Sequence, residues 1–498
     1  MKHLFTVLIA IIVIAGCKKT SNVNENKTLV RDTRNIPVSE DLQKIYSERR
    51  KDLLSHIDNG IVILRSGNVN NDDRYEFRVA DNFYYLTGYT EPVSAIVLKK
   101  DKSYPYTLFI KERNIREAMY YGETPEIDDI MVTYQTDTVL PYHELGRIIQ
   151  ENVRTGTPIY ADFKDSFLTD SIFNTFKKLK ASDKLINDIT PLIDEMRVHK
   201  DISEITRLQK AVDITGEAFI NACRICRPGM YEFEMEAMIV YTFLRLGSPI
   251  PAFPSIVASG PNDVIFHYSA KNRNMREGDL VLIDIGTEYC YYSSDITRTI
   301  PVNGKFSKEQ KDIYELVLKA QKAAISEMMP GNYFTRGDYK SAEVFVHGLY
   351  KLGLITNLES DWQKKFYILY PAINHYLGMY VHDVGDFGVP YSVFVENVVK
   401  DTIYGRTLEK GMVLTVEPGL YFRSNGLSQI FELFDKEATR EEIQRFIDEV
   451  SPVYEKYKNI GVRIEDDVLI SDKGNIVLSK NIPKEIDEIE RIMSKRNH

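Results

Sequence analysis

Residues 281–299 read VLIDIGTEYCYYSSDITRT, an apolar strand-like run followed by a second run, each containing one aspartate. A turn centred near residues 289–290 would fold the runs into a hairpin, and in that register Asp284 lies opposite Asp295 on one face. Two carboxylates opposed on a mostly apolar strand pair repel each other unless a positive charge lies between them. A divalent metal ion is the usual positive charge, so this hairpin predicts a metal site.

Three more isolated polar residues have the same character as these aspartates. Glu417 ends the apolar run 412–416, His375 precedes a Tyr-Leu-Gly segment, and Glu465 lies in a run where two-residue alternation places Arg463 on the same face. Any one alone would be explained as a structural residue, but the set favours a site. Four carboxylates and one imidazole form an oxygen-rich ligand set, which suits Mn²⁺ better than a metal that prefers thiolates.

The composition is that of an enzyme-sized globular protein. The chain has 498 residues, of which 63 are Lys or Arg and 72 are Asp or Glu, so the net charge is −9. These values exclude wholesale disorder, and an acidic chain without a long basic run is not expected to bind nucleic acid. Four cysteines cannot form a disulfide framework. Cys223 and Cys226 form a C-x-x-C, but with Phe219 they recur at helical spacing, so we expect a buried helix face rather than a metal or redox site.

The N-terminus has the pattern of a bacterial lipoprotein signal. Lys2 precedes a twelve-residue run from Leu4 to Ala15, apolar except for one Thr, and Ala15-Gly16-Cys17 then resembles a lipobox. We expect cleavage before Cys17, lipidation of that residue, and a location in the bacterial cell envelope, anchored to a membrane with the folded domains outside the cytoplasm. The alternatives are a short transmembrane anchor or an ordinary signal peptide.

The rest of the chain alternates helical and strand patterns, which indicates an α/β (α+β) protein with more than one domain. Helical patterns cover residues 39–57, 202–226, 307–329 and 341–352, and strand patterns cover 60–64, 94–99, 107–110, 280–284, 412–416 and 462–469. The expected organisation is a signal peptide at 1–16, a flexible tether at 17–35, an N-terminal domain at 36–195 and a C-terminal domain at 196–498.

A charged segment lies between the last two predicted strands. Thr439 and Glu442 form a capping-box signature, and apolar residues at helical spacing follow. We expect a surface helix here, inserted between the strands and ended by Pro452.

Five motifs together resemble a known family. They are VLIDIGTEYCYYSSDITRTIPVNGKF at 281–306, HYLGMYVHDVG at 375–385, LTVEPGLYF at 414–422, GVRIEDDVLI at 461–470, and DNFYYLTGYTEP at 81–92. The first four look like the metal-binding motifs of the pita-bread metallopeptidases, and within that group the chain looks most like aminopeptidase P. The resemblance implies an N-terminal α/β domain with a mixed sheet. It also implies a catalytic pita-bread domain with a curved, antiparallel-rich sheet covered by helices.

The resemblance also assigns roles to single residues. It implies that two divalent metal ions are bound by five ligands, namely Asp284, Asp295, His375, Glu417 and Glu465. Asp295 and Glu465 match the bridging positions, and Glu417 matches the general base for a metal-bridging hydroxide. His267 and His382 match histidines that contact substrate, and Arg463 matches a residue that braces the site. For the two histidines, a buried structural role is the alternative.

The implied activity is hydrolysis of the bond between an N-terminal residue and a following proline. Peptides with proline at the second position are the implied substrates, Mn²⁺ the implied metal with Zn²⁺ or Co²⁺ as alternatives, and a homo-oligomer (dimer or tetramer) the implied assembly. An Xaa-Pro dipeptidase and a non-catalytic binding protein on the same scaffold remain alternatives. One position departs from the family. Pro371 stands where the family usually has a histidine, which implies altered turnover or substrate preference unless another residue covers the role.

Overall fold

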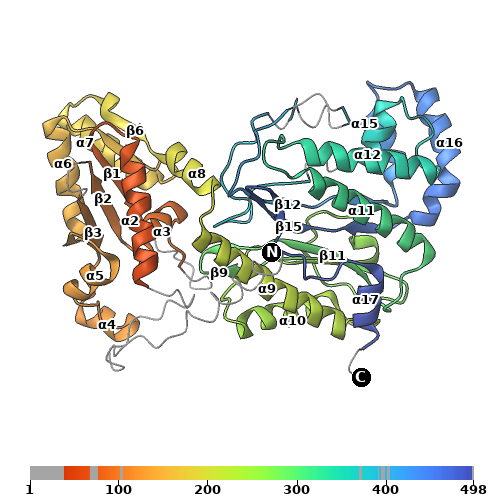
Figure 1. Cartoon of the computed structure of the whole chain (residues 1–498), viewed down its shortest axis with the longest axis horizontal. Coiled ribbons are helices and arrows are strands. Elements are labelled where there is room, and N and C mark those ends of the chain that lie inside the picture. Colours follow the sequence, from red (N-terminus) through yellow and green to blue (C-terminus); the bar gives the residue numbers. More distant parts are fainter. Residues whose placement is uncertain are drawn as a thin grey trace, which may run out of the picture.

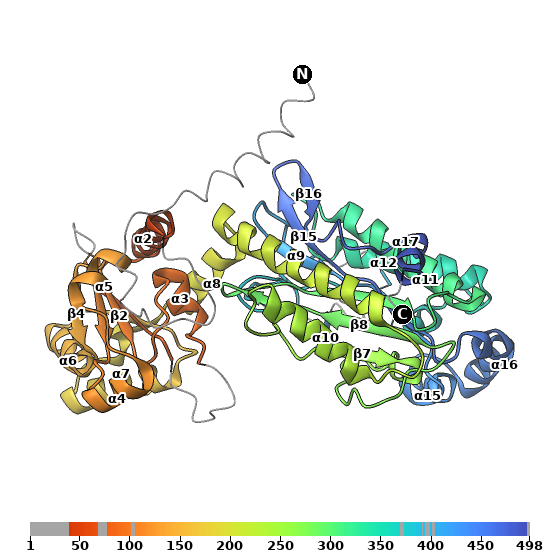
Figure 2. The ribbon, with the colours of Figure 1, turned by 90° about the horizontal axis from the view of Figure 1, so that it is seen from below.

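A computed structural model gives the fold, and Figures 1 and 2 show two domains side by side, with the N-terminal domain at the left. It describes residues 39–67, 77–100, 105–368, 373–390, 392–393, 399–400 and 404–495. The predicted signal peptide, tether and lipidated Cys17 lie outside these ranges, as does Pro371. In the part of the chain that is described, no helix is both long and apolar enough to cross a membrane.

The N-terminal domain contains a mixed six-stranded sheet in the order β4-β3-β2-β1-β5-β6. The central strands β1, β2 and β3 pair antiparallel, whereas β4, β5 and β6 join in parallel. This confirms the predicted α/β domain with a mixed sheet. The strands are β1 (Ile61–Arg65), β2 (Ala95–Lys99), β3 (Tyr106–Ile110), β4 (Thr138–Pro141), β5 (Ile159–Ala161) and β6 (Ile186–Asp188).

Helices cover both faces of this sheet, which explains why its central strand β1 is buried along its whole length. In β1, Val62 and Leu64 belong to one hydrophobic cluster and Ile61 and Ile63 to another. The first cluster continues into the C-terminal domain. The helices are α2 (Glu40–Ser55), α3 (Asp81–Thr87), α4 (Ile115–Tyr121), α5 (Ile127–Tyr134), α6 (Leu145–Thr155), α7 (Ser166–Leu179) and α8 (Thr190–Val198).

The C-terminal domain is built on strands that all pair antiparallel, in ladders β11-β8-β7, β12-β15-β16, β13-β14 and β9-β10. The β11-β8-β7 ladder meets the chain between β14 and β15 where Glu465 donates its backbone N–H to the Thr297 carbonyl, at 3.0 Å. The strands are β7 (Ile256–Ser259), β8 (Leu280–Ile285), β9 (Glu288–Tyr289), β10 (Tyr292–Ser293), β11 (Ile296–Pro301), β12 (Val413–Val416), β13 (Gly419–Tyr421), β14 (Gly461–Arg463), β15 (Asp466–Ser471) and β16 (Gly474–Val477).

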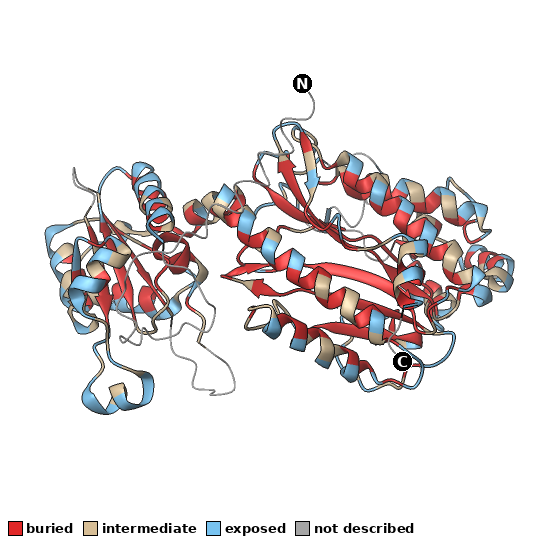
Figure 3. Cartoon of the chain, turned by 60° about the horizontal axis from the view of Figure 1, so that its bottom comes forward, coloured by how far each residue is buried: buried red, intermediate tan, exposed pale blue. Residues whose placement is uncertain are grey.

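Long helices pack on these strands, and Figure 3 shows the strands as a buried layer beside half-exposed helices. This is the pita-bread arrangement that the resemblance implied. Capping boxes start α9 at Asp201 and α11 at Ser307. The helices are α9 (Ile202–Ile225), α10 (Glu232–Arg245), α11 (Lys308–Glu327), α12 (Arg336–Lys351), α13 (Asp361–Tyr367), α15 (Gly426–Leu433), α16 (Arg440–Tyr457) and α17 (Ile486–Met493).

The predictions for the two cysteines of the C-x-x-C and for the domain boundary can be compared with the structure. Cys223 and Cys226 are fully buried at the end of α9, so the predicted apolar helix face is confirmed. The boundary predicted between residues 195 and 196 falls inside helix α8, and it stays a prediction.

Two element predictions were wrong. The single strand expected at 462–469 is two strands, because β14 pairs with β13 whereas β15 pairs with β12 and β16. Glu465 lies in the break between them. Pro452 does not end the inserted helix, since α16 starts at the predicted cap Thr439 and continues to Tyr457. The last turn is retained because Tyr454 and Tyr457 are buried, which offsets the hydrogen bond that proline cannot make.

Candidate metal centre

The hairpin that suggested a metal site forms, but its register differs from the predicted one. Strands β8 and β11 pair Asp284 with Thr297 rather than with Asp295. The turn residues are Cys290 and Tyr291, which both have positive φ angles of 49° and 70°. A shift of two residues preserves which side chains share a face, because the side-chain period of a strand is two. The register was therefore wrong, and the two aspartates are diagonal rather than direct neighbours.

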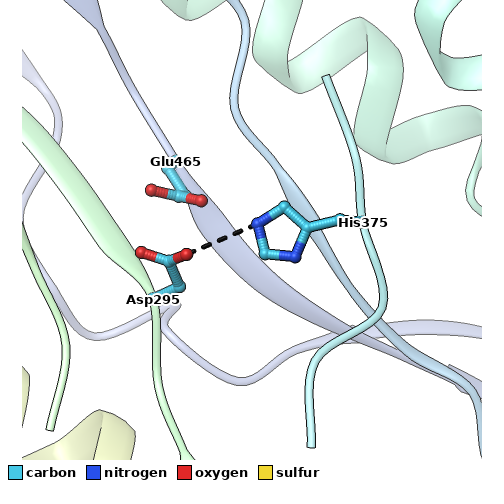
Figure 4. Close-up of side chains that lie close together, drawn as sticks. All are labelled: Asp295, His375 and Glu465. Atoms are coloured by element: carbon cyan, nitrogen blue, oxygen red, sulfur yellow. Dashed lines mark ion pairs between the residues drawn. The ribbon is translucent and has the colours of Figure 1, made fainter. Parts of the chain in front are cut away.

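Residues from three segments come together next to this hairpin. Ligand atoms of Asp295, His375 and Glu465 all lie within 4.8 Å of one another (Figure 4). His375 Nε2 is 3.4 Å from Asp295 Oδ2 and 3.5 Å from Glu417 Oε1. Glu417 therefore belongs to the same group, which unites four of the five predicted ligands.

The segment that carries His375 runs beside strand β12. The His375 N–H donates to Thr415 Oγ1 at 3.2 Å, and the Thr415 N–H donates to the His375 carbonyl at 3.0 Å. The Glu417 N–H donates in turn to the Ile373 carbonyl at 2.8 Å. These bonds place the imidazole and the Glu417 carboxylate side by side.

Asp284, the fifth predicted ligand, is tied to the group through an arginine. Its Oδ2 accepts a hydrogen bond from Arg463 Nη2. Arg463 Nε lies 3.9 Å from Glu417 Oε2, and Arg463 Nη1 donates to Tyr421 OH at 2.9 Å. The buried guanidinium thus holds two of the predicted ligands in place, which is the bracing position expected for Arg463.

The carboxylates carry more negative charge than the surrounding side chains neutralise. Within the described residues, Asp284 Oδ1, Asp295 Oδ1 and Glu465 Oε1 are buried without a hydrogen-bond partner. Burial raises the pKa of Asp295 well above its ordinary value, and the nearby carboxylates, Glu465 first, raise it further. The pKa of Glu465 is raised by burial and then by Glu417 and Asp284. Buried oxygens of this kind need cations, so the residues present fit divalent metal ions.

His375 is in the form that binds metals. Burial lowers its pKa to about 3, with a smaller effect from His382, so the ring is neutral at physiological pH. Its Nδ1 lies 3.1 Å from the Tyr376 carbonyl, which can only accept a hydrogen bond. The proton therefore belongs on Nδ1, and the lone pair of Nε2 faces the Asp295 and Glu417 carboxylates.

The two other predicted histidines lie at the outer side of this group. Both His267 and His382 are exposed, which excludes the alternative of buried structural histidines. The rings of His375 and His382 meet edge to face with centroids 4.2 Å apart. Partial desolvation lowers the pKa of His382, and the neighbouring His267 lowers it further, so His382 is a neutral hydrogen-bonding group.

Three supporting residues were not predicted. Thr297 Oγ1 donates to Glu465 Oε2 at 2.7 Å, and Tyr421 contacts Arg463 as described above. Asp338, on α12, accepts hydrogen bonds from the Ile373 N–H at 2.8 Å and from Asn374 Nδ2 at 2.9 Å, which fixes the chain just before His375. Burial raises the pKa of Asp338 to about 7. Thr297 could have been found from the correct hairpin register, but no local pattern marks Asp338.

The fold and the site together define a hydrolase of the pita-bread metallopeptidase class, in which an antiparallel sheet holds a carboxylate and imidazole cluster for divalent metal. Residues 206–472 match the model of metallopeptidase family M24, and residues 46–160 match that of the aminopeptidase P N-terminal domain. The chain belongs to metallopeptidase family M24 and carries the N-terminal domain of aminopeptidase P.

Relatives and solved structures agree with this assignment. A Haemophilus influenzae protein named Xaa-Pro aminopeptidase is 33% identical over 90% of this chain and 97% of its own length. An Escherichia coli protein of the same name is 32% identical over 85% of this chain and 90% of its own length. The structure of proline aminopeptidase P II from Yersinia pestis matches with a TM-score of 0.76 and 31% identity, covering 91% of this chain and 99% of that one. The structure of zinc-substituted E. coli aminopeptidase P in complex with product matches with a TM-score of 0.77 and 30% identity. The match covers 92% of this chain and 99% of that one.

Proposed function

We propose that this protein is a metal-dependent exopeptidase that hydrolyses the bond between an N-terminal residue and a following proline. The observation that carries the proposal is the buried group of Asp295, His375, Glu417 and Glu465, in which Asp295 Oδ1 and Glu465 Oε1 have no hydrogen-bond partner within the described residues. It lies in a chain that matches relatives named Xaa-Pro aminopeptidase over most of its length.

Each residue of the site has a proposed task. Asp284, Asp295, His375, Glu417 and Glu465 would hold two divalent ions, and Asp295 and Glu465 would contribute to the binding of both. When bound, such ions lower the pKa of a water molecule and polarise a carbonyl group. Glu417 takes the proton of the attacking water as general base, and Arg463 keeps Asp284 and Glu417 in place. His382 and His267 donate hydrogen bonds to the substrate oxygen that gains negative charge and to the departing amine.

Manganese is the metal we propose for this site. Four carboxylates and one imidazole offer mainly hard oxygen ligands, and no thiolate is among them. Zinc is an alternative, since E. coli aminopeptidase P has been solved in a zinc-substituted form, and cobalt is a second alternative implied by the family resemblance alone.

A peptide panel tests the activity and its register. The metal-free protein lacking residues 1–19 is given Mn²⁺, Zn²⁺ or Co²⁺ and then Xaa-Pro, Xaa-Pro-Yaa and Xaa-Ala-Yaa peptides. We expect release of Xaa from Xaa-Pro-Yaa, fastest with Mn²⁺, and little cleavage of Xaa-Ala-Yaa. Cleavage of the dipeptide alone would instead identify a dipeptidase. Metal binding without turnover of any peptide would contradict the enzymatic function and favour a binding protein. The first variant to test would then be Pro371→His.

We also propose that the protein is a lipoprotein of the bacterial cell envelope, anchored through Cys17. The support is the sequence alone: a short apolar run ending in Ala15-Gly16-Cys17, then a polar tether. In a bacterial host, the full chain should fractionate with membranes and incorporate labelled palmitate, and Cys17→Ala should lose the label. A labelled Cys17→Ala protein would contradict the proposal. The homo-oligomer implied by the family resemblance stays a prediction.

A further inference from the structure

The loop between His375 and His382 is held by residues from outside the metal-binding strands. Arg78, just before α3 of the N-terminal domain, donates from Nη2 to the Met379 carbonyl at 2.9 Å. Arg197, in α8 at the junction of the domains, donates from Nη2 to Asp383 Oδ1 at 2.5 Å. Asp383 directly follows His382, and its side chain is 1% exposed. The two arginines therefore hold the loop at two points, one beside His382.

These two arginines are joined to each other through helix α3. Arg78 Nη1 donates to Asp81 Oδ1, and Arg197 Nη2 lies 3.4 Å from Asp81 Oδ2. Arg197 Nη1 also donates to Asn82 Oδ1 at 2.7 Å. Asp81 and Asn82 begin α3, so the first turn of this helix orients both guanidinium groups. Figure 1 shows α3 and α8 on the side of the N-terminal domain that faces the C-terminal domain.

The 376–383 loop is also held together by its own hydrogen bonds, so a shift of Met379 or Asp383 is expected to move the rest of the loop. The Asp383 N–H donates to the Tyr376 carbonyl at 2.9 Å, and Asp383 Oδ2 accepts from the Met379 N–H at 3.2 Å. Asp383 thus ties its own loop together while Arg197 ties it to α8. Because each bond is directional, the position of Asp383 sets the backbone from which His382 projects.

Arg78 also reaches the hairpin that carries Asp284 and Asp295. Its Nε donates to Glu288 Oε2 at 2.6 Å, and its guanidinium lies 4.6 Å from the ring centroid of Tyr291. Tyr291 is in the left-handed region, with φ of 70°, a conformation that is unfavourable for a bulky residue. Its ring stacks on Tyr84 of α3 at 3.9 Å, so contacts with the N-terminal domain hold the hairpin tip in this conformation.

We propose that Arg78 and Arg197 are positioning residues, through which the N-terminal domain fixes the 376–383 loop and orients His382 beside the metal centre. The proposal deepens the function given above and rests on it for the role of His382. The hydrogen bonds described above for the two arginines go to groups other than the proposed metal ligands and His382. The arginines act through Met379, Asp383 and the hairpin tip, and misplacement of a contacting group by about 1 Å can cost about 100-fold in rate.

The test compares Arg78→Met and Arg197→Met with Arg65→Met. Methionine keeps much of the apolar stem and removes the guanidinium. Arg65 is the control, because its side chain is 5% exposed, against 4% for Arg197 and 23% for Arg78, and it pairs with Asp165 within the N-terminal domain. Hydrogen exchange of the Met379 and Asp383 amides is measured by mass spectrometry in metal-free and metal-loaded protein, together with kcat and KM for Xaa-Pro-Yaa.

We expect the Met379 and Asp383 amides to exchange at least about tenfold faster in Arg78→Met and Arg197→Met than in wild type, with or without metal. In both variants kcat should fall about 10–100-fold, while KM stays within about threefold of the wild-type value. Arg65→Met should show neither change. Should a methionine variant fail to fold, Asp81→Asn removes the shared charge with little change in shape, and an intermediate effect is expected. Unchanged exchange and kcat, or equal changes in Arg65→Met, would overturn the proposal. Because exchange needs no substrate, a failure of the proposed peptidase activity alone leaves this readout intact.

Discussion

Asp295→Ala is expected to lose metal binding and peptidase activity together, with kcat/KM reduced about 10³-fold or more. Asp295 lies within the group of ligand atoms and is proposed to bind both ions, so its removal should weaken the binding of both. Loss of metal-derived charge stabilisation worth about 4 kcal/mol corresponds to about 10³-fold in rate. Metal content by atomic emission and turnover of Xaa-Pro-Yaa would be measured on the same preparation.

The matched control is Asp263→Ala, which removes another buried aspartate. Asp263 is 1% exposed, burial raises its pKa as it does for Asp295, and its backbone lies against Gly461. This control should keep its metal and its activity. Full activity in Asp295→Ala would refute the ligand assignment.

The same variant should alter how the metal-free protein responds to pH. The raised pKa values of Asp295 and Glu465 mean that the native state binds these protons more tightly than the unfolded chain. The resulting stabilisation is fully present below the ordinary carboxyl pKa of about 4 and is lost as the pH rises through the raised values. In calorimetry, chelated wild-type protein should unfold at a lower temperature at pH 8 than at pH 5. Asp295→Ala should narrow that difference, and an unchanged difference would contradict the charge repulsion inferred for the site.

The grouping of Asp295, His375, Glu417 and Glu465 could be predicted because each is an isolated charged or imidazole group in an apolar context. Asp284 lies within a buried strand and Glu417 follows the end of another, and neither has a local charge partner in the sequence. A cation shared by these carboxylates is therefore the simplest explanation. The family resemblance then assigned roles to all of them. The α/β class of the N-terminal domain could be predicted because the strand and helix periods are both clear, whereas its mixed sheet was implied by the family resemblance.

The hairpin register could not be predicted because its turn lacks the usual residues. Tight hairpin turns with positive φ favour glycine or asparagine, whereas this turn uses Cys290 and Tyr291. Tyr291 takes that conformation because its ring stacks on Tyr84, about two hundred positions earlier in the chain. A contact of this kind leaves no trace in local sequence, and neither do the interdomain bonds of Arg78. The break at Glu465 has a similar origin, since it marks where the chain changes strand partners.

His382→Ala is expected to keep its metal and lose about 100-fold in kcat, the opposite combination to that of Asp295→Ala. The His382 ring is exposed, lies beside His375 and is neutral, so it can donate a hydrogen bond to substrate without serving as a ligand. Removal of one such donor typically costs about 10²–10³-fold.

Two further variants, His347→Ala and His382→Gln, serve as controls for this prediction. His347→Ala, an exposed histidine on α12, should behave as wild type. His382→Gln should recover part of the loss, because the amide can still donate a hydrogen bond to the substrate oxygen. If His382→Ala loses metal along with activity, the histidine supports the metal centre rather than the substrate. A kcat within about threefold of wild type would mean that His267, or another group at the site, supplies the hydrogen bond, because the energy of one donor to a developing charge would otherwise be missing.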